Sequence, residues 1–149
     1  MKCATTIAIK FGCAAVLGLS LISSAAPAGT PEGIWLSEDG ATKVRIANCA
    51  GKLCGTLVWL DKPTDATTGK PKTDKHNPDP AKRSRPLLGL QVVRGLAPSG
   101  PDKWSGLIYN ADDGRTYQAH LKVQSANAAH VEGCVLAILC KGQTWKRSN

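Results

Sequence analysis

The sequence lacks two patterns that are typical of helical membrane proteins and helical bundles. Its longest apolar stretch, Phe11 to Ile22, has about a dozen residues, whereas a membrane-spanning helix needs roughly 20. A long helical period of apolar residues is also missing. These absences exclude an all-helical fold and favour a protein without a membrane-spanning helix.

Catalytic and metal-binding motifs are equally scarce. The chain has no G-x-S-x-G nucleophile elbow and no C-x2-C pair, and its basic residues are scattered. A hydrolase triad of His76, Asp79 and Ser84 therefore has no supporting motif, and prolines interrupt a calcium loop built on Asp74, Asn77 and Asp79. We predict a protein that is not an enzyme, holds no metal or cofactor, and does not bind nucleic acid.

The beginning of the chain has the pattern of a secretory signal peptide. Lys2 and Lys10 provide positive charge, the apolar stretch follows, and small residues come next. We expect residues 1–28 to be a removable leader and residues 29–149 to form one domain; the alternative is an uncleaved N-terminal anchor. The leader predicts a periplasmic or secreted protein with no transmembrane segment after cleavage.

The charge of the expected domain is positive. The leader holds two of the 19 Lys and Arg residues and none of the 11 Asp and Glu residues, which leaves a formal charge of +6. A basic exported protein is attracted to anionic envelope surfaces. The alternative is that this charge serves solubility alone.

Four cysteines remain after the leader, and an even number in an exported chain predicts two disulfides. The local pairing joins Cys49 to Cys54 and Cys134 to Cys140, and would clip two turns. Crossed pairings would tie the second and seventh predicted strands together, and long loops stabilise more than short ones. The spacing favours the local pairing only slightly.

Short alternating runs separated by turn residues predict an all-β fold. The expected strands are Ile34–Ser37, Thr42–Asn48, Leu53–Leu60, Leu87–Leu96, Trp104–Asn110, Thr116–Gln124, His130–Leu136 and Gly142–Arg147. Mostly short turns join them, so we predict an antiparallel, eight-stranded, up-and-down barrel, because closure removes the two sheet edges.

Aromatic motifs at the two ends support closure. Gly33 and Trp35 form a G-x-W in the first strand, while Trp145 and Arg147 lie in the last. If these strands are neighbours, the Arg147 guanidinium can cover the Trp35 indole. We expect these four residues to close one end of the barrel, with Trp145 as the alternative buried partner.

The candidate ligand site lies elsewhere. Inward-facing aromatic residues line a cavity or simply fill the core. The proline-rich segment Asp61–Arg85 has the composition of a loop that is functional or disordered. Its arginines would reach an anionic head group, or would pair with Asp65, Asp74 or Asp79. The predicted ligand-binding residues are Trp59, Arg83, Arg85, Trp104, Tyr109 and Tyr117.

Several of these motifs together resemble a known family. The motifs are Gly33-Ile34-Trp35, Leu53-Cys54-Gly55, Val58-Trp59-Leu60, the run from Asn77 to Leu90, Trp104-Ser105-Gly106, Ile108-Tyr109-Asn110, Asp113-Gly114, Thr116-Tyr117 and Gln143-Thr144-Trp145 with Arg147. The chain is similar, from about residue 31 to 147, to the small exported bacterial proteins catalogued as domain of unknown function 2147. The resemblance implies a lipocalin-like barrel of the calycin type and no settled activity.

The sequence therefore predicts an exported barrel that binds a small apolar or amphipathic molecule derived from the cell envelope. The Asp61–Arg85 segment would form the rim or lid of the open end. The alternative is an envelope interaction or structural protein whose filled barrel binds an anionic surface or a protein partner.

Overall fold

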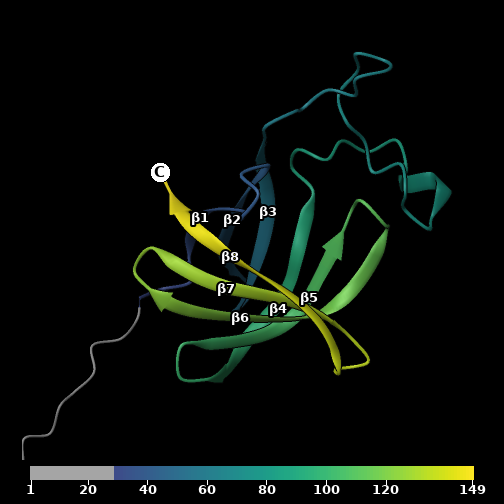
Figure 1. The fold of residues 1–149 in the computed structure, drawn as a ribbon. Helices are drawn as coiled ribbons and strands as arrows, with labels where there is room; N and C mark the ends of the chain where they lie inside the picture. The colour runs from purple at the N-terminus through teal and green to yellow at the C-terminus, as the bar shows by residue number, and fades with distance from the viewer. Residues whose placement is uncertain (1–28) are drawn as a thin grey trace, which may run out of the picture.

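The computed structural model describes residues 29–149, so the expected leader lies outside the described residues. Eight antiparallel strands follow one another around a closed barrel, and β1 also pairs with β8 (Figure 1). This confirms the predicted all-β, eight-stranded, up-and-down barrel. The strands are β1 Gly33–Leu36, β2 Thr42–Cys49, β3 Lys52–Leu60, β4 Gln91–Gly100, β5 Lys103–Asn110, β6 Arg115–Ser125, β7 Ala128–Val135 and β8 Leu139–Ser148.

The fourth strand differs most from its predicted bounds. It begins at Gln91 rather than Leu87, because Gly89 adopts a positive φ of 86° and Leu90 N–H donates to Leu87 O in a turn. It also continues past Leu96 to Gly100, through a register shift against β5. The apolar run before Gln91 thus belongs to a turn that packs on the core.

The barrel interior is filled by apolar side chains. The buried cluster includes Trp35, Ile46, Val93, Leu121 and Trp145, all at most 3% exposed. Strand alternation sends these side chains inward, where large residues sit beside small ones. A Cβ added at Gly55 would lie 2.8 Å from the side chain of its β4 neighbour Val93, so the interior has no room for a larger residue at this position.

Arg147 covers the Trp35 ring at one end of the barrel. The guanidinium carbon lies 4.2 Å from the centroid of the Trp35 ring. Its nitrogens donate to three backbone carbonyls: Ala126 O at 2.5 Å, Glu32 O at 2.8 Å and Thr30 O at 2.6 Å. The side chain therefore joins the segment before β1, the β6–β7 turn and β8. We call this the closed end.

The disulfides follow the local pairing, Cys49–Cys54 and Cys134–Cys140. The first clips the β2–β3 hairpin at the closed end. The second clips the β7–β8 hairpin at the opposite end, where the long β3–β4 connection also lies (Figure 1). Within residues 29–149, no helix is long and apolar enough to cross a membrane.

Candidate functional site

The end opposite Arg147 carries the long β3–β4 connection, residues 61–90, which we call the strap. The strap is ordered by its own backbone pairing. Isolated bridges join Thr64 to Pro71 and Thr73 to Pro86, and a short 3-10 helix, Pro80–Lys82, is capped by the Asp79 side chain. Gly89 N–H donates to Leu57 O at 2.8 Å, which ties the end of the strap to β3. The strap therefore has a defined backbone structure, although its sequence shows no periodic pattern of apolar residues.

A buried polar cluster holds the strap on the barrel. Asp74 is fully buried, and its carboxylate accepts from Tyr109 Oη at 2.6 Å and from Asn77 Nδ2 at 2.7 Å. Arg85 completes the cluster, with Nε and Nη2 at 2.9 and 2.8 Å from the same carboxylate. Every donor points at one buried anion, which is the arrangement that makes burying a charge tolerable. The cluster is a latch between the strap and β5.

The latch shifts the acidity of its members. Burial raises the pKa of Asp74, but the hydrogen bonds from Tyr109, Asn77 and Arg85 outweigh it, so the net pKa lies below the ordinary value. Burial and the Asp74 carboxylate raise the pKa of Tyr109. Asp74 is therefore a stable carboxylate and Tyr109 a neutral donor at neutral pH.

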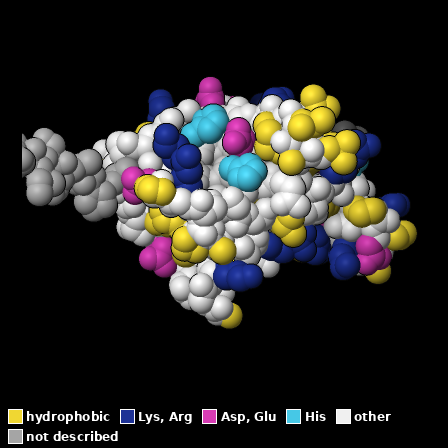
Figure 2. All heavy atoms as spheres, turned by 90° about the horizontal axis from the view of Figure 1, so that it is seen from below, with side chains coloured by type: hydrophobic (Ala, Val, Ile, Leu, Met, Phe, Trp, Pro, Cys, Tyr) yellow, Lys and Arg dark blue, Asp and Glu magenta, His cyan; other side chains and the backbone are white. Residues whose placement is uncertain are grey.

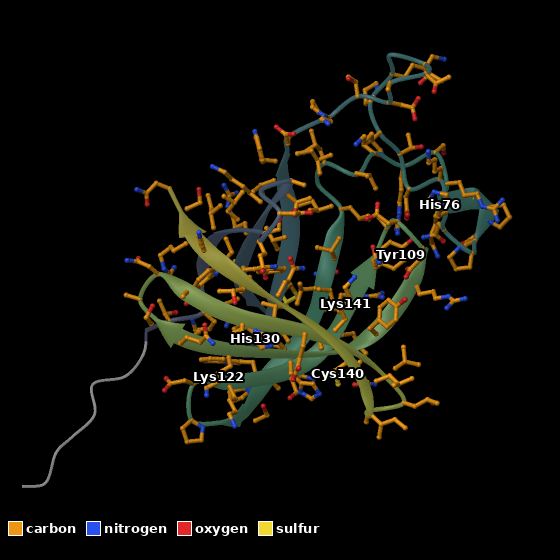
Figure 3. The ribbon with its side chains drawn as sticks, in the orientation of Figure 1. His76, Tyr109, Lys122, His130, Cys140 and Lys141 are labelled. Atoms are coloured by element: carbon orange, nitrogen blue, oxygen red, sulfur yellow. A yellow bond between two sulfur atoms is a disulfide. The ribbon has the colours of Figure 1, made fainter. Side chains whose placement is uncertain are left out.

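The strap also contacts the β5–β6 turn. Gly114 has a positive φ of 70°, and a Cβ added there would lie 1.9 Å from His76 O. Only glycine permits this approach of two backbones. His76 and Tyr109 lie close together in this part of the molecule (Figure 3). The turn and the latch thus fix the strap at two points.

A groove lies at the same end, on β5, β6 and β7. Its volume is about 420 Å³, and it is open to solvent. The lining residues are Leu107, Arg115, Thr116, Tyr117, Gln118, Cys134, Val135 and Leu136. A smaller groove of about 260 Å³ lies near the closed end, where Trp104, Leu53 and Leu96 are among its lining residues.

The structure does not bring the six predicted ligand-binding residues together. Tyr109 and Arg85 belong to the latch, Tyr117 lines the larger groove, and Trp104 lines the smaller one. The remaining two residues, Arg83 and Trp59, line neither groove. The Nε of Arg83 donates to Asn77 O at 2.8 Å. Trp59 is 39% exposed, and Lys43 Nζ lies 5.6 Å from the centroid of its ring.

Sequence reasoning missed two features of this end. The sequence offers Asp74 as one of three acids for the arginines and, with Asn77, as an unsupported calcium ligand, but it does not predict that these two residues together hold the strap. Arg115 and Leu107 are not among the predicted ligand-binding residues, because strand alternation places both at ordinary exposed positions. The density of Asn, Asp and Arg in the segment 74–85 was the available signal for the latch.

Comparisons with known proteins agree with this fold. The family model described as "Uncharacterized protein conserved in bacteria (DUF2147)" matches residues 33–147. Protein HP1028 from the human pathogen Helicobacter pylori, described as belonging to the lipocalin family, has a similar structure with a TM-score of 0.69 and 24% identity. That similarity covers 81% of this chain and 84% of HP1028, and it shows a lipocalin-like fold. No curated protein matches the sequence significantly.

Proposed function

The chain belongs to the uncharacterised bacterial family DUF2147, and we propose that its barrel binds a small amphipathic anion in the groove of β5, β6 and β7. The protein acts as a binding protein and not as an enzyme. The expected leader and the two disulfides support an exported location, where disulfides persist.

The composition of the groove is the observation that carries the proposal. Leu107, Val135 and Leu136 offer an apolar surface, while Arg115 supplies a cation at the same site. Within the described residues, Arg115 forms no ion pair within 4.0 Å. A guanidinium binds carboxylate or phosphate through paired hydrogen bonds, so an apolar chain with an anionic head fits this lining.

The size of the groove is also suitable. A volume of about 420 Å³ falls within the usual range for small-molecule sites, roughly 300–1,000 Å³. By contrast, the barrel interior is occupied by the buried apolar cluster, which includes two tryptophans. An eight-stranded barrel either fills its interior or holds one small ligand there. The filled core supports placing the ligand in the groove and not inside the barrel.

Replacing Arg115 with Ala is expected to weaken binding of octanoate or octyl phosphate about tenfold or more, because a charge-assisted hydrogen bond is lost. Isothermal titration calorimetry measures the dissociation constant. Arg45→Ala is the matched control, since Arg45 is an exposed arginine on β2, outside the groove. Arg45→Ala should bind like the wild type.

Two results would contradict the proposal. One is the absence of binding by the wild-type protein to either amphiphile. The other is normal binding by Arg115→Ala together with lost binding by Arg83→Ala, which would place the anionic head at the strap instead.

A further inference from the structure

The tip of the β7–β8 hairpin is a continuous apolar segment in solvent. Val135 is 44% exposed, Leu136 82%, Ile138 79% and Leu139 68%, with Ala137 between them. Figure 2 shows hydrophobic side chains gathered on part of the surface, with Lys or Arg, Asp or Glu, and His side chains beside them. Single exposed apolar residues are ordinary, but five consecutive ones at a turn call for a partner.

The backbone conformation of the tip is one that apolar residues with a side chain rarely adopt. Leu136 and Ala137 have φ values of 53° and 58°, and Ile138 N–H donates to Val135 O at 3.3 Å. Positive φ at both central residues of a hairpin turn strongly favours Asn-Gly. The turn therefore keeps apolar side chains where polar or small residues suit the backbone better. The chemistry of these side chains, and not the turn geometry, accounts for their presence.

A disulfide stands directly beneath the tip. Cys134 and Cys140 are register partners at the last rungs of the β7–β8 ladder, with their Cα atoms 4.0 Å apart. The bond joins the two strands directly below the loop. Presenting apolar groups in a fixed conformation lowers the entropic cost of binding.

Charges of both signs lie near the tip. Lys141 follows Cys140 directly on β8 (Figure 3). Arg115 lines the adjoining groove. Acids also lie near the base of the tip: the Asp113 carboxylate accepts from Tyr117, and Glu132 lies 3.9 Å from His130. The net charge of residues 29–149 is +6. An apolar tip on a domain with this net positive charge is complementary to an anionic lipid surface.

We propose that the Val135–Leu139 tip inserts into the head-group region of an anionic lipid bilayer, with Lys141 at the phosphate level. The tip is too narrow for a stable protein interface, which buries about 800 Å² per partner. Insertion of a few aliphatic side chains to a depth of roughly 5–10 Å needs no such area. The tip shares Val135 and Leu136 with the lining of the groove, whereas Ile138 and Leu139 belong to the tip alone.

Vesicle co-sedimentation tests the proposal. The wild-type protein is expected to bind vesicles of phosphatidylglycerol and phosphatidylethanolamine, and to bind phosphatidylcholine vesicles weakly. Ile138→Ser with Leu139→Ser should reduce binding to the anionic vesicles about tenfold or more, because two membrane-contacting side chains are lost. Leu88→Ser is the matched control, since Leu88 is a 45% exposed leucine on the strap.

A second variant separates the role of the side chains from the role of the turn. Leu136→Asn with Ala137→Gly should raise or maintain the melting temperature, because Asn-Gly suits the positive φ values, while still weakening vesicle binding. The proposal is overturned if the wild-type protein does not bind anionic vesicles, or if both hairpin variants bind them like the wild type. Concentration-dependent dimerisation through the tip would also overturn it. Octanoate binding by Ile138→Ser/Leu139→Ser reports on the groove independently, since neither residue lines it.

Discussion

Replacing Asp74 with Asn is expected to lower the free energy of unfolding by about 3 kcal/mol. The carboxylate is fully buried and accepts from Tyr109, Asn77 and Arg85, so the amide would face donors that it cannot satisfy. Breaking a buried pair costs about 3–5 kcal/mol, and the partial exposure of Arg85 places this case at the lower end. Urea denaturation measures the change.

The control for this variant is Lys82→Ala. Lys82 Nζ lies 2.9 Å from Asp79 in a pair whose side chains are 55% and 44% exposed, so its loss should change stability little. A similar stability for Asp74→Asn and the wild type would show that the latch does not hold the fold.

The Asp74 latch also predicts a dependence on pH. Its folded-state pKa lies below the ordinary value, so its contribution to stability is complete above the unfolded pKa of about 4. That contribution is lost as the pH falls through the folded pKa. The difference in stability between the wild type and Asp74→Asn should therefore be constant near neutral pH and shrink in acid.

Replacing Arg147 with Ala is expected to lower the free energy of unfolding by about 2–3 kcal/mol. The side chain donates to Thr30, Glu32 and Ala126 carbonyls and covers the Trp35 ring. Hydrogen bonds from charged groups contribute about 1.5–3 kcal/mol each when buried, and partial solvent access at the closed end reduces their sum. Thermal unfolding followed by circular dichroism measures the loss.

Octanoate binding distinguishes a structural role for Arg147 from a functional one. The groove lies at the opposite end of the barrel, so Arg147→Ala should leave the dissociation constant unchanged below its melting temperature. A variant with wild-type stability, or one that loses binding while remaining folded, would contradict the assignment of Arg147 to barrel closure.

The strands could be predicted because their signal is local. Val44 and Ile46 alternate with Lys43 and Arg45, and this two-residue period directly marks a strand with one buried face. Closure of the barrel could be predicted from Trp35 and Arg147, because the first and last strands of a closed sheet become neighbours. The cysteine pairing stayed open because both local and crossed loops satisfy the spacing, and only the register of Cys134 opposite Cys140 decides it.

The site could not be predicted in the same way, because its contacts are distant in sequence and polar. Tyr109 meets Asp74 across 35 positions, and such a contact leaves no period in the chain. Arg85 was expected either to bind a ligand or to pair with an acid, and the structure pairs it with Asp74. The hairpin tip was hidden for the opposite reason: apolar residues such as Leu136 and Ile138 are ordinarily taken as buried.

A small amphipathic anion bound in the groove, outside a filled barrel, would contact residues of β5, β6 and β7. The most direct measurement is an NMR titration of the isotopically labelled protein with octyl phosphate, followed through its backbone amide signals. Binding in the groove predicts shifts confined to Leu107, residues 115–118 and residues 134–136. Shifts centred on buried core residues such as Leu121, Val131 and Trp145 would place the ligand inside the barrel and contradict it.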